Sequence, residues 1–426
     1  MSNEPYVRTE MLSEQPAPLG QTGILRWMRE NLFSSVWNSI LSILAMLFVA
    51  LVLAKLLPWA IQPSWSSDSL GTCQENPDIT GACWGVIRDR FNQLMFGFYP
   101  SELQWRPMLA FVLMLTAIAP VLFDKLPRKM MWFSAIYPFL AVWLLWGGSI
   151  WGPAMALAGF VIGFFAHKLL KGPVGELAAM ILAVLATILW WLYAVDPVAG
   201  ALATSVPVNL TEVISSNFGG LMLSITIGVS GIAFSLPLGI VLALGRQSDM
   251  FIIKILCVGF IEFIRGVPLI TLLFVASVLL SFFLPPDTNF DLILRVIIMV
   301  TIFASAYMAE VIRGGLAGLP TGQYEAADAL GLNYWQSMQL VIMPQALKIS
   351  IPGIVGTFIG VFKDTTLVSL IGLLDPVGLI VTIQGTHDWS GVVWELYLFI
   401  ALMFWVFTFS MSRYSMYLEN KLKTTH

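Results

Sequence analysis

The chain has 426 residues, of which 58% are hydrophobic and 11% are charged, and its formal net charge is -3. Because soluble globular chains carry about 25% charged residues, a chain this poor in charge cannot cover a water-facing surface, and most of it must face lipid. The negative net charge gives no sign of the basic patch that nucleic-acid binding requires, and three cysteines and three histidines are too few and too scattered for a metal cluster.

Apolar runs long enough to cross a bilayer recur along the whole chain. A spanning helix needs about 20 mostly apolar residues, because only a helix satisfies its own backbone groups in lipid. Ten segments meet this requirement: 38–59, 107–123, 130–148, 150–166, 173–195, 219–244, 252–284, 292–312, 347–373 and 392–412. Glycines and a proline between 147 and 153 predict a tight hairpin there. The run 252–284 is too long for one span, so we expect its first part to lie along the membrane interface.

Lysines and arginines gather in alternate loops between these spans. They precede the first span and follow the second, fourth, sixth, eighth and tenth, whereas the loops 196–218, 285–291 and 374–391 contain none. Positively charged loops stay on the cytoplasmic side, so both terminal tails, 1–37 and 421–426, are predicted to be cytoplasmic. The first span carries no Ala-x-Ala cleavage site, and we expect it to be a retained anchor rather than a signal peptide.

The outer loop 60–106 contains two of the three cysteines. Its three arginines do not overturn the orientation, because long loops translocate largely regardless of charge. Cys73 and Cys83 lie ten residues apart in it, and the outer face of an inner membrane permits oxidation. The pair therefore fits either a disulfide or two unpaired thiols in a small cap. Cys257 lies in apolar sequence, which is typical of a buried thiol.

The two halves of the chain differ in the charge that falls inside their spans. The extension, 38–205, is rich in Trp and Phe and nearly free of such charge, which is typical of a peripheral jacket of helices. A linker at 206–218 separates it from the core, 219–420. Charge inside a membrane is costly and marks function, so a translocation path is expected in the core. Its intramembrane charges are Glu262, Arg265, Arg295, Glu310, Arg313, Lys363 and Asp364.

The segment between the eighth and ninth spans has the signals of two short helices. Pro320 and Gly322 break the preceding helix, and good helix formers follow them. Gly331 permits a C-cap turn, and Asn333 with Gln336 predicts a capping box at the start of a second helix. Three alanines keep the first helix slim, which suits insertion into a groove on another protein. The alternative is an ordinary loop that packs on its own helix ends.

This segment, 320–346, resembles the EAA loop of ABC-importer permeases. The matching residues are Glu325, Ala326, Ala327, Gly331, Val341, Met343 and Pro344, with Val341 and Met343 in place of the usual Ile and Leu. The flanking motifs resemble the polar-amino-acid (HisMQ-like) permease family more specifically. They lie at 262–268, with Val267 for Thr, and at 307–314, 322–325, 344–346 and 362–367. The resemblance covers 219–420, and the added spans resemble the long membrane subunit of general L-amino-acid uptake systems in Gram-negative bacteria.

The resemblance implies a type I permease core of five helices whose cytoplasmic coupling helix contacts a separate ATPase. The residues implied in coupling are Gly322, Glu325, Ala326, Ala327, Gly331 and Pro344. For Glu325, the alternative is a helix N-terminal charge with no partner. The sequence contains no phosphate-binding loop of the Gly-x-x-x-x-Gly-Lys type, so ATP and magnesium would be used by two partner ATPase subunits. A periplasmic amino-acid binding protein and a second permease, a paralogue rather than a copy, are the other implied partners.

Residues of both charges in the core could bind an amino-acid zwitterion in a low-dielectric cavity. The candidates for the substrate pathway or gate are Glu262, Arg265, Tyr307, Glu310, Arg313, Lys363, Asp364 and Thr365. Glu262 and Arg265 are three residues apart, so they either pair locally or, because the helix breaks just after them, flank a half-helix end that faces substrate. Glu310 and Arg313 have the same spacing and fit a gate, a coupling brace or a substrate contact.

The predicted function is therefore amino-acid import across a bacterial inner membrane, with no catalytic residues and no cofactor of its own. An ion-coupled secondary transporter would need inverted repeats, which the halves do not show. A membrane enzyme would need a catalytic His, Cys or acid pair in a span, whereas His167, His387 and His426 lie at span ends or the terminus. An opine or another small polar amine stays open as the substrate.

Overall fold

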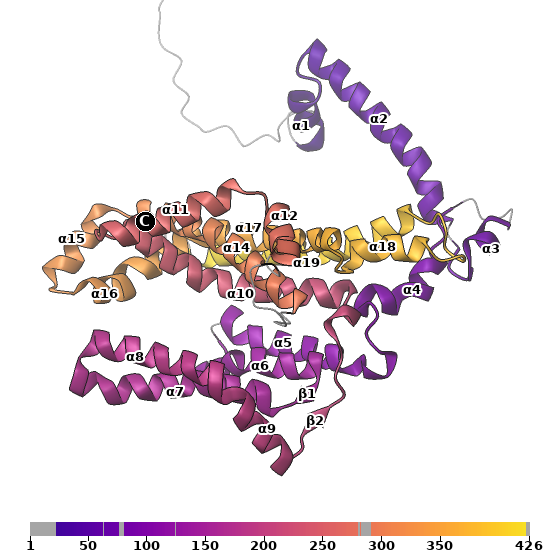
Figure 1. Ribbon diagram of the computed structural model, residues 1–426. Helices are drawn as coiled ribbons and strands as arrows, with labels where there is room; N and C mark the ends of the chain where they lie inside the picture. The colour runs from indigo at the N-terminus through magenta and orange to yellow at the C-terminus, as the bar shows by residue number, and fades with distance from the viewer. Residues whose placement is uncertain are drawn as a thin grey trace, which may run out of the picture. The chain divides into compact units, whose positions relative to one another are not determined.

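The computed structural model describes residues 23–62, 64–75, 81–123, 125–279, 282 and 291–422. The chain divides into two compact units, Met1–Gly85 and Val86–His426, whose helices are drawn in Figure 1. Predictions for residues 1–22, for most of the loop 285–291 and for residues 423–426 lie outside the described residues.

The first unit contains the first membrane helix and a small closed loop. Its helices are α1 (Gly23–Asn31), α2 (Val36–Ile61) and α3 (Leu70–Glu75). Ser35 caps α2 by accepting a hydrogen bond from the backbone N–H of Asn38 at 3.2 Å. After α2, a disulfide joins Cys73 to Cys83, and the ring of Trp84 lies 5.8 Å from the rings of both Trp59 and Trp65. Of the two alternatives for the cysteines, the structure has the disulfide.

The second unit begins with the remaining helices of the extension. They are α4 (Gly85–Phe96), α5 (Trp105–Leu122), α6 (Met131–Trp146), α7 (Trp151–Val174), α8 (Glu176–Leu189) and α9 (Val195–Ser205). The predicted hairpin joins α6 to α7 through Gly147 and Gly148, whose φ angles are 76° and 75°. There β1 (Gly148–Ser149) pairs antiparallel with β2 (Asn209–Leu210). The fifth span continues beyond 195, because α8, the π-helical turn Trp190–Ala194 and α9 form one stretch from Glu176 to Ser205.

The core follows as a second series of helices. They are α10 (Gly220–Gln247), α11 (Phe251–Gly266), α12 (Leu269–Phe274), α14 (Leu292–Ala317), α15 (Thr321–Ala329), α16 (Tyr334–Ser337), α17 (Met343–Asp364), α18 (Pro376–Gln384) and α19 (Trp394–Leu422). In the described chain, nine helical stretches are long and apolar enough to span a membrane, and the pair α11 and α12, bent by 100°, makes up to ten. These ten match the ten predicted spans. The bend also agrees with the expectation that 252–284 is not one straight span.

Small residues let α10 and α14 pack side by side in parallel. A Cβ atom on Gly231 would lie 2.8 Å from Cγ1 of Val300, and one on Gly239 would lie 2.6 Å from Cβ of Met308. With Ser235 between them, these glycines form the small-xxx-small pattern that allows close helix approach in membranes. The close fit brings the carboxyl-terminal ends of both helices to one end of the unit, where α14 leads into α15 (Figure 1).

The opposite end of the unit connects α4 to the core. The backbones of Gly97 and Phe218 form a bridge, as do those of Gly219 and Leu374. A Cβ on Gly97 would collide with the backbone of Gly219, so this contact requires glycine. Residues 86–205 and the core therefore share one compact unit.

Candidate functional site

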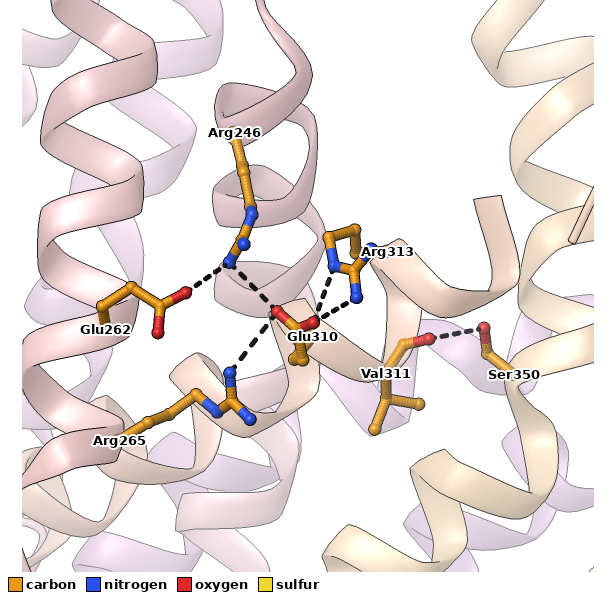
Figure 2. Close-up of polar contacts among 7 residues, drawn as sticks. All are labelled: Arg246, Glu262, Arg265, Glu310, Val311, Arg313 and Ser350. Atoms are coloured by element: carbon orange, nitrogen blue, oxygen red, sulfur yellow. Dashed lines mark hydrogen bonds and ion pairs between the residues drawn. The ribbon is translucent and has the colours of Figure 1, made fainter. Parts of the chain in front are cut away.

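Five charged side chains meet where α10, α11 and α14 come together (Figure 2). Glu310 on α14 is the centre, because its carboxylate contacts three arginines. Arg246 lies 3.0 Å and Arg265 3.5 Å from its Oε2, and Nε of Arg313 donates to its Oε1 at 2.7 Å. Arg246 also reaches Oε1 of Glu262 at 3.0 Å. We call Arg246, Glu262, Arg265, Glu310 and Arg313 the Glu310 cluster.

The Glu310 cluster differs from the local pairing that helix spacing suggests. Arg246, in the last turn of α10, takes Glu262 as a partner, and Arg265 pairs with Glu310 on another helix. Only Arg313 and Glu310 pair at the i, i+3 spacing that the sequence indicates. Glu262 and Arg265 take partners on other helices because parallel packing brings the end of α10 beside α14. Arg246 carried no functional prediction, and its only sequence signal was a basic residue at the end of a span.

The cluster is partly shielded from solvent and carries excess positive charge. The exposed fraction of the side chain is 22% for Glu310 and 24% for Arg246. Three arginines face two glutamates, so one positive charge is left over. The guanidinium carbon of Arg265 lies 5.6 Å from the centre of the Tyr307 ring, which is within range of a cation–π contact. The predicted residue Tyr307 therefore also belongs to this region.

The turn after α14 leads directly to the predicted coupling segment. Gly318 caps α14, and α15 starts at Thr321 after Pro320. Gly322, which the sequence suggested as a helix breaker, lies instead in the first turn of α15, because the preceding helix has already ended at Ala317. Gly331 then adopts a φ of 69°, as expected of a C-cap residue.

The predicted capping box starts the second short helix. The N–H of Gln336 donates to the side chain of Asn333 at 2.9 Å, and the N–H of Asn333 donates to the side chain of Gln336 at 3.0 Å. The amides of Gln345 and Gln323 bond at 2.9 Å, which ties α15 to α17. Together these contacts hold α15 and α16 in a defined position relative to α17.

The outer side of α15 and α16 is exposed and unusually apolar. Glu325 is exposed and Ala327 is buried, so Ala327 faces the protein and Glu325 faces outward. Leu330 is 76% and Trp335 71% exposed, and Tyr334 is also exposed. We call Glu325, Leu330, Tyr334 and Trp335 the α15–α16 surface. The sequence analysis assigned no role to Leu330, Tyr334 or Trp335. The only signal for them was a leucine and two aromatic residues in a segment that lies between two spans.

Most of the remaining implied coupling residues lie at the surface. Ala326, Gly322 and Gly331 are exposed, and Pro344 is exposed in the first turn of α17. Within this surface region, Ala327 is the buried member of the set.

Lys363, Asp364 and Thr365 form a second, separate group. They lie at the end of α17 and the start of the 3-10 helix Thr365–Ile371. Ser350, whose hydroxyl donates to the carbonyl oxygen of Val311 at 3.2 Å, marks where α17 passes the Glu310 cluster (Figure 2). At 1.5 Å per residue, Lys363 is then about 20 Å further along the helix. The structure therefore does not bring the predicted pathway residues together at one place.

Within this second group, the three side chains have different surroundings. Lys363 is exposed and Asp364 partly buried. Thr365 is fully buried and donates its hydroxyl to the carbonyl oxygen of Phe362 at 2.8 Å. Its methyl group also packs against Gly228 of α10. Thr365 thus has a packing role, and the two charged residues are the accessible ones.

Across the described residues, no group of three or more His, Cys, Asp or Glu side chains could hold an ion.

Comparisons with known proteins identify the family. Residues 235–424 match the model described as binding-protein-dependent transport system inner membrane component. The glutamate/glutamine/aspartate/asparagine transport system permease protein BztC of Rhodobacter capsulatus is 55% identical over 100% of both chains. The inner membrane amino-acid ABC transporter permease protein YhdY of Escherichia coli is 40% identical over 97% of this chain and 98% of its own. The probable glutamine ABC transporter permease protein GlnP of Bacillus subtilis is 31% identical over 45% of this chain and 87% of its own. With two relatives matched along almost their whole length, the chain belongs to the polar-amino-acid (HisMQ-like) family of ABC-importer permeases.

Proposed function

We propose that this chain is a permease subunit of an importer for amino acids that include glutamate, aspartate and their amides. The observation that carries the proposal is the 55% identity, over the full length of both chains, to a permease named for those four amino acids. The other two relatives are named for amino acids or glutamine, which supports the same substrate class.

Members of this family are transport subunits, and a partner subunit hydrolyses ATP. We propose two ATPase subunits that use ATP and magnesium, a periplasmic binding protein and a paralogous second permease. We also propose that the end of the core bearing α15 faces the cytoplasm, together with both termini. The distribution of lysine and arginine supports this orientation.

The α15–α16 surface is the contact we propose for the ATPase. Exposed apolar and aromatic side chains such as Leu330 and Trp335 are costly in water, and Trp is enriched among residues that dominate protein–protein binding. Glu325 lies on the same surface and would meet a basic group of the partner.

The Glu310 cluster is, in this proposal, a brace that transmits force. Arg313 lies in the last turns of α14, and α15 starts only a few residues later. Because Glu310 connects α10, α11 and α14 through ion pairs, a movement of α15 would shift the three helix ends together. Helices that move as one body can open and close a path between two permeases.

Lys363 and Asp364 are the residues we propose for contact with substrate. They supply one charge of each sign, as the ammonium and carboxylate groups of an amino acid require. Lys363 is exposed within a helix long enough to span the membrane, where an unpaired charge is costly unless it faces a polar path.

Uptake measured in vesicles containing the complete transporter tests the proposal. Radiolabelled glutamate, aspartate, glutamine and asparagine should enter, each dependent on ATP and insensitive to collapse of the proton gradient. Leucine, lysine and an opine serve as comparison substrates. Uptake that survives ATP depletion but stops when the gradient is collapsed would instead identify an ion-coupled transporter. Uptake of the opine alone would overturn the amino-acid assignment.

A further inference from the structure

The short helix α1 has one apolar side and one charged side. Ile24, Trp27 and Met28 lie at the i, i+3, i+4 spacing of a single helix face. Arg26, Arg29 and Glu30 occupy the other face, where Arg26 and Glu30 form an ion pair at 2.8 Å. Ile24 is 78% and Trp27 57% exposed. Within the first unit, the described residues therefore leave this apolar face uncovered, and it needs a partner.

The position of α1 restricts what that partner can be. Helix α1 ends at Asn31 and α2 begins at Val36, and five residue steps span at most about 18 Å. The link is also folded back, because the hydroxyl of Ser42, inside α2, donates to the carbonyl oxygen of Leu32 at 2.8 Å. Since α2 is long and apolar enough to cross the membrane, α1 is held beside the point where that helix meets the membrane surface.

We propose that α1 is an interfacial anchor, lying in the headgroup region with Ile24, Trp27 and Met28 in the lipid. Helices with a charged face and an opposite apolar face that includes Trp bind in this way, with the apolar face buried about 5–10 Å deep. The indole of Trp prefers this zone, since it has an apolar body and a polar N–H. Arg26 and Arg29 outnumber Glu30 on the charged face, and this net positive charge is attracted by anionic lipid headgroups.

An anchor at this place would fix the depth and rotation of α2. Ser35 caps α2 and Ser42 bonds to the link, so the orientation of α1 is passed directly to the first membrane helix. The inference concerns the first unit alone and is independent of the proposed transport function.

Spin-label accessibility in the complete transporter, reconstituted in phosphatidylcholine/phosphatidylglycerol nanodiscs, tests the proposal. Labels are attached at Ile24→Cys, Trp27→Cys and Glu30→Cys in a Cys257→Ser background, because Cys73 and Cys83 are joined in a disulfide. Labels at 24 and 27 should collide several-fold more with oxygen, which concentrates in lipid, than with a water-soluble nickel chelate. The label at 30 should show the reverse preference.

The outcomes separate the possible partners of α1. Protection of positions 24 and 27 from both reagents would mean that a protein covers the face, and equal access of the chelate to all three positions would mean that α1 lies free in water. Either result would overturn the proposal. The label at Ile24→Cys leaves Trp27 in place, so loss of the anchor in the Trp27→Cys variant can be recognised by comparison. Thermal unfolding of each labelled complex checks that the helices are intact.

Discussion

The indole Nε1 of Trp389 donates a hydrogen bond to Oδ2 of Asp89 at 2.7 Å, although 300 residues separate them in the sequence. Trp389 lies in the segment that connects α18 to α19, and its side chain is fully buried. Asp89 lies on α4, the helix that opens the second unit. The bond ties the extension to the core at the end opposite α15. The extension is thus attached through specific polar contacts as well as through apolar packing.

Replacing Asp89 by alanine should destabilise the protein, because the buried indole N–H would lose its acceptor. A buried donor without a partner costs about 1–3 kcal/mol. Asp89→Asn is the matched control, since its carbonyl oxygen can still accept the bond. The unfolding temperature of the detergent-purified protein should therefore fall clearly in Asp89→Ala and by less in Asp89→Asn. Equal unfolding temperatures for alanine and wild type would contradict this role.

Neutralising Glu310 should uncouple transport from ATP hydrolysis. The Glu310→Gln change leaves three arginines around a neutral side chain, and each lost charged contact is worth about 1.5–3 kcal/mol. We expect uptake to fall at least about tenfold, since 1.4 kcal/mol corresponds to a factor of ten, while basal ATPase activity persists. Glu262→Gln is the control, because Glu262 contacts Arg246 alone among the cluster arginines and is 54% exposed. Its effect on uptake should be smaller, and an equal effect would argue against Glu310 as the centre.

Removing the ring of Trp335 should weaken binding of the ATPase. Truncation of a central aromatic side chain typically costs about 2 kcal/mol or more of binding free energy, which is roughly a thirtyfold change in Kd. Trp394→Ala is the control, because Trp394 is 73% exposed and lies at the start of α19, away from the α15–α16 surface. The measurement is the amount of ATPase that co-purifies with each variant in mild detergent. Equal retention by both variants would exclude this contact.

Glu325 and Gly331 should matter for uptake but not for membrane insertion. Glu325→Ala removes the charge of the α15–α16 surface, and Gly331→Val forces a β-branched side chain into a φ of 69°, a conformation that costs about 1–2 kcal/mol for residues other than glycine. Gly200→Ala, where a Cβ meets open space within helix α9, is the control for a glycine change. Wild-type uptake in both Glu325→Ala and Gly331→Val would remove the basis for a coupling role.

The stability of the core should depend on the protonation of Asp375. This carboxyl group is fully buried at the start of α18, where it accepts hydrogen bonds from the N–H groups of Gly378 and Val377. Burial raises its pKa from 3.8 to about 6. The folded state binds the proton of Asp375 more tightly than the unfolded state does. The protonated carboxyl group therefore contributes its full stabilisation of the fold below about pH 4, and this contribution is lost as the pH rises through 6. The loss amounts to about 3 kcal/mol.

Comparison with Asp375→Asn isolates this effect from the other titrating groups. Asparagine keeps the helix cap but does not ionise, so its unfolding temperature relative to wild type should rise between pH 4.5 and pH 8. A constant difference across this range would mean that Asp375 does not titrate there.

Local sequence signals predicted much of the fold and part of the site. The ten spans follow from the length and apolar character of each run, and the capping box of Asn333 and Gln336 follows from residues three positions apart. The glycine hairpin between α6 and α7 has the same local origin. In each case the interacting residues lie within a few positions of one another, so the local sequence is enough to predict the interaction. Helix α18 was missed because its nine residues are too short to read as a span.

The sequence by itself determined that this is a membrane permease, because the scarcity of charge is a property of composition and the motifs of the core are local sequence patterns. The tertiary structure alone decided which charges on different helices meet. Parallel packing of α10 and α14 through Gly231 and Gly239 brings Arg246 to Glu310, and backbone contact at Gly97 brings Asp89 to Trp389. Such pairs depend on how helices approach in three dimensions, and helical spacing specifies only partners on the same helix. That is why Glu310 and Arg313 could be paired from the sequence, whereas the partner of Glu262 could not.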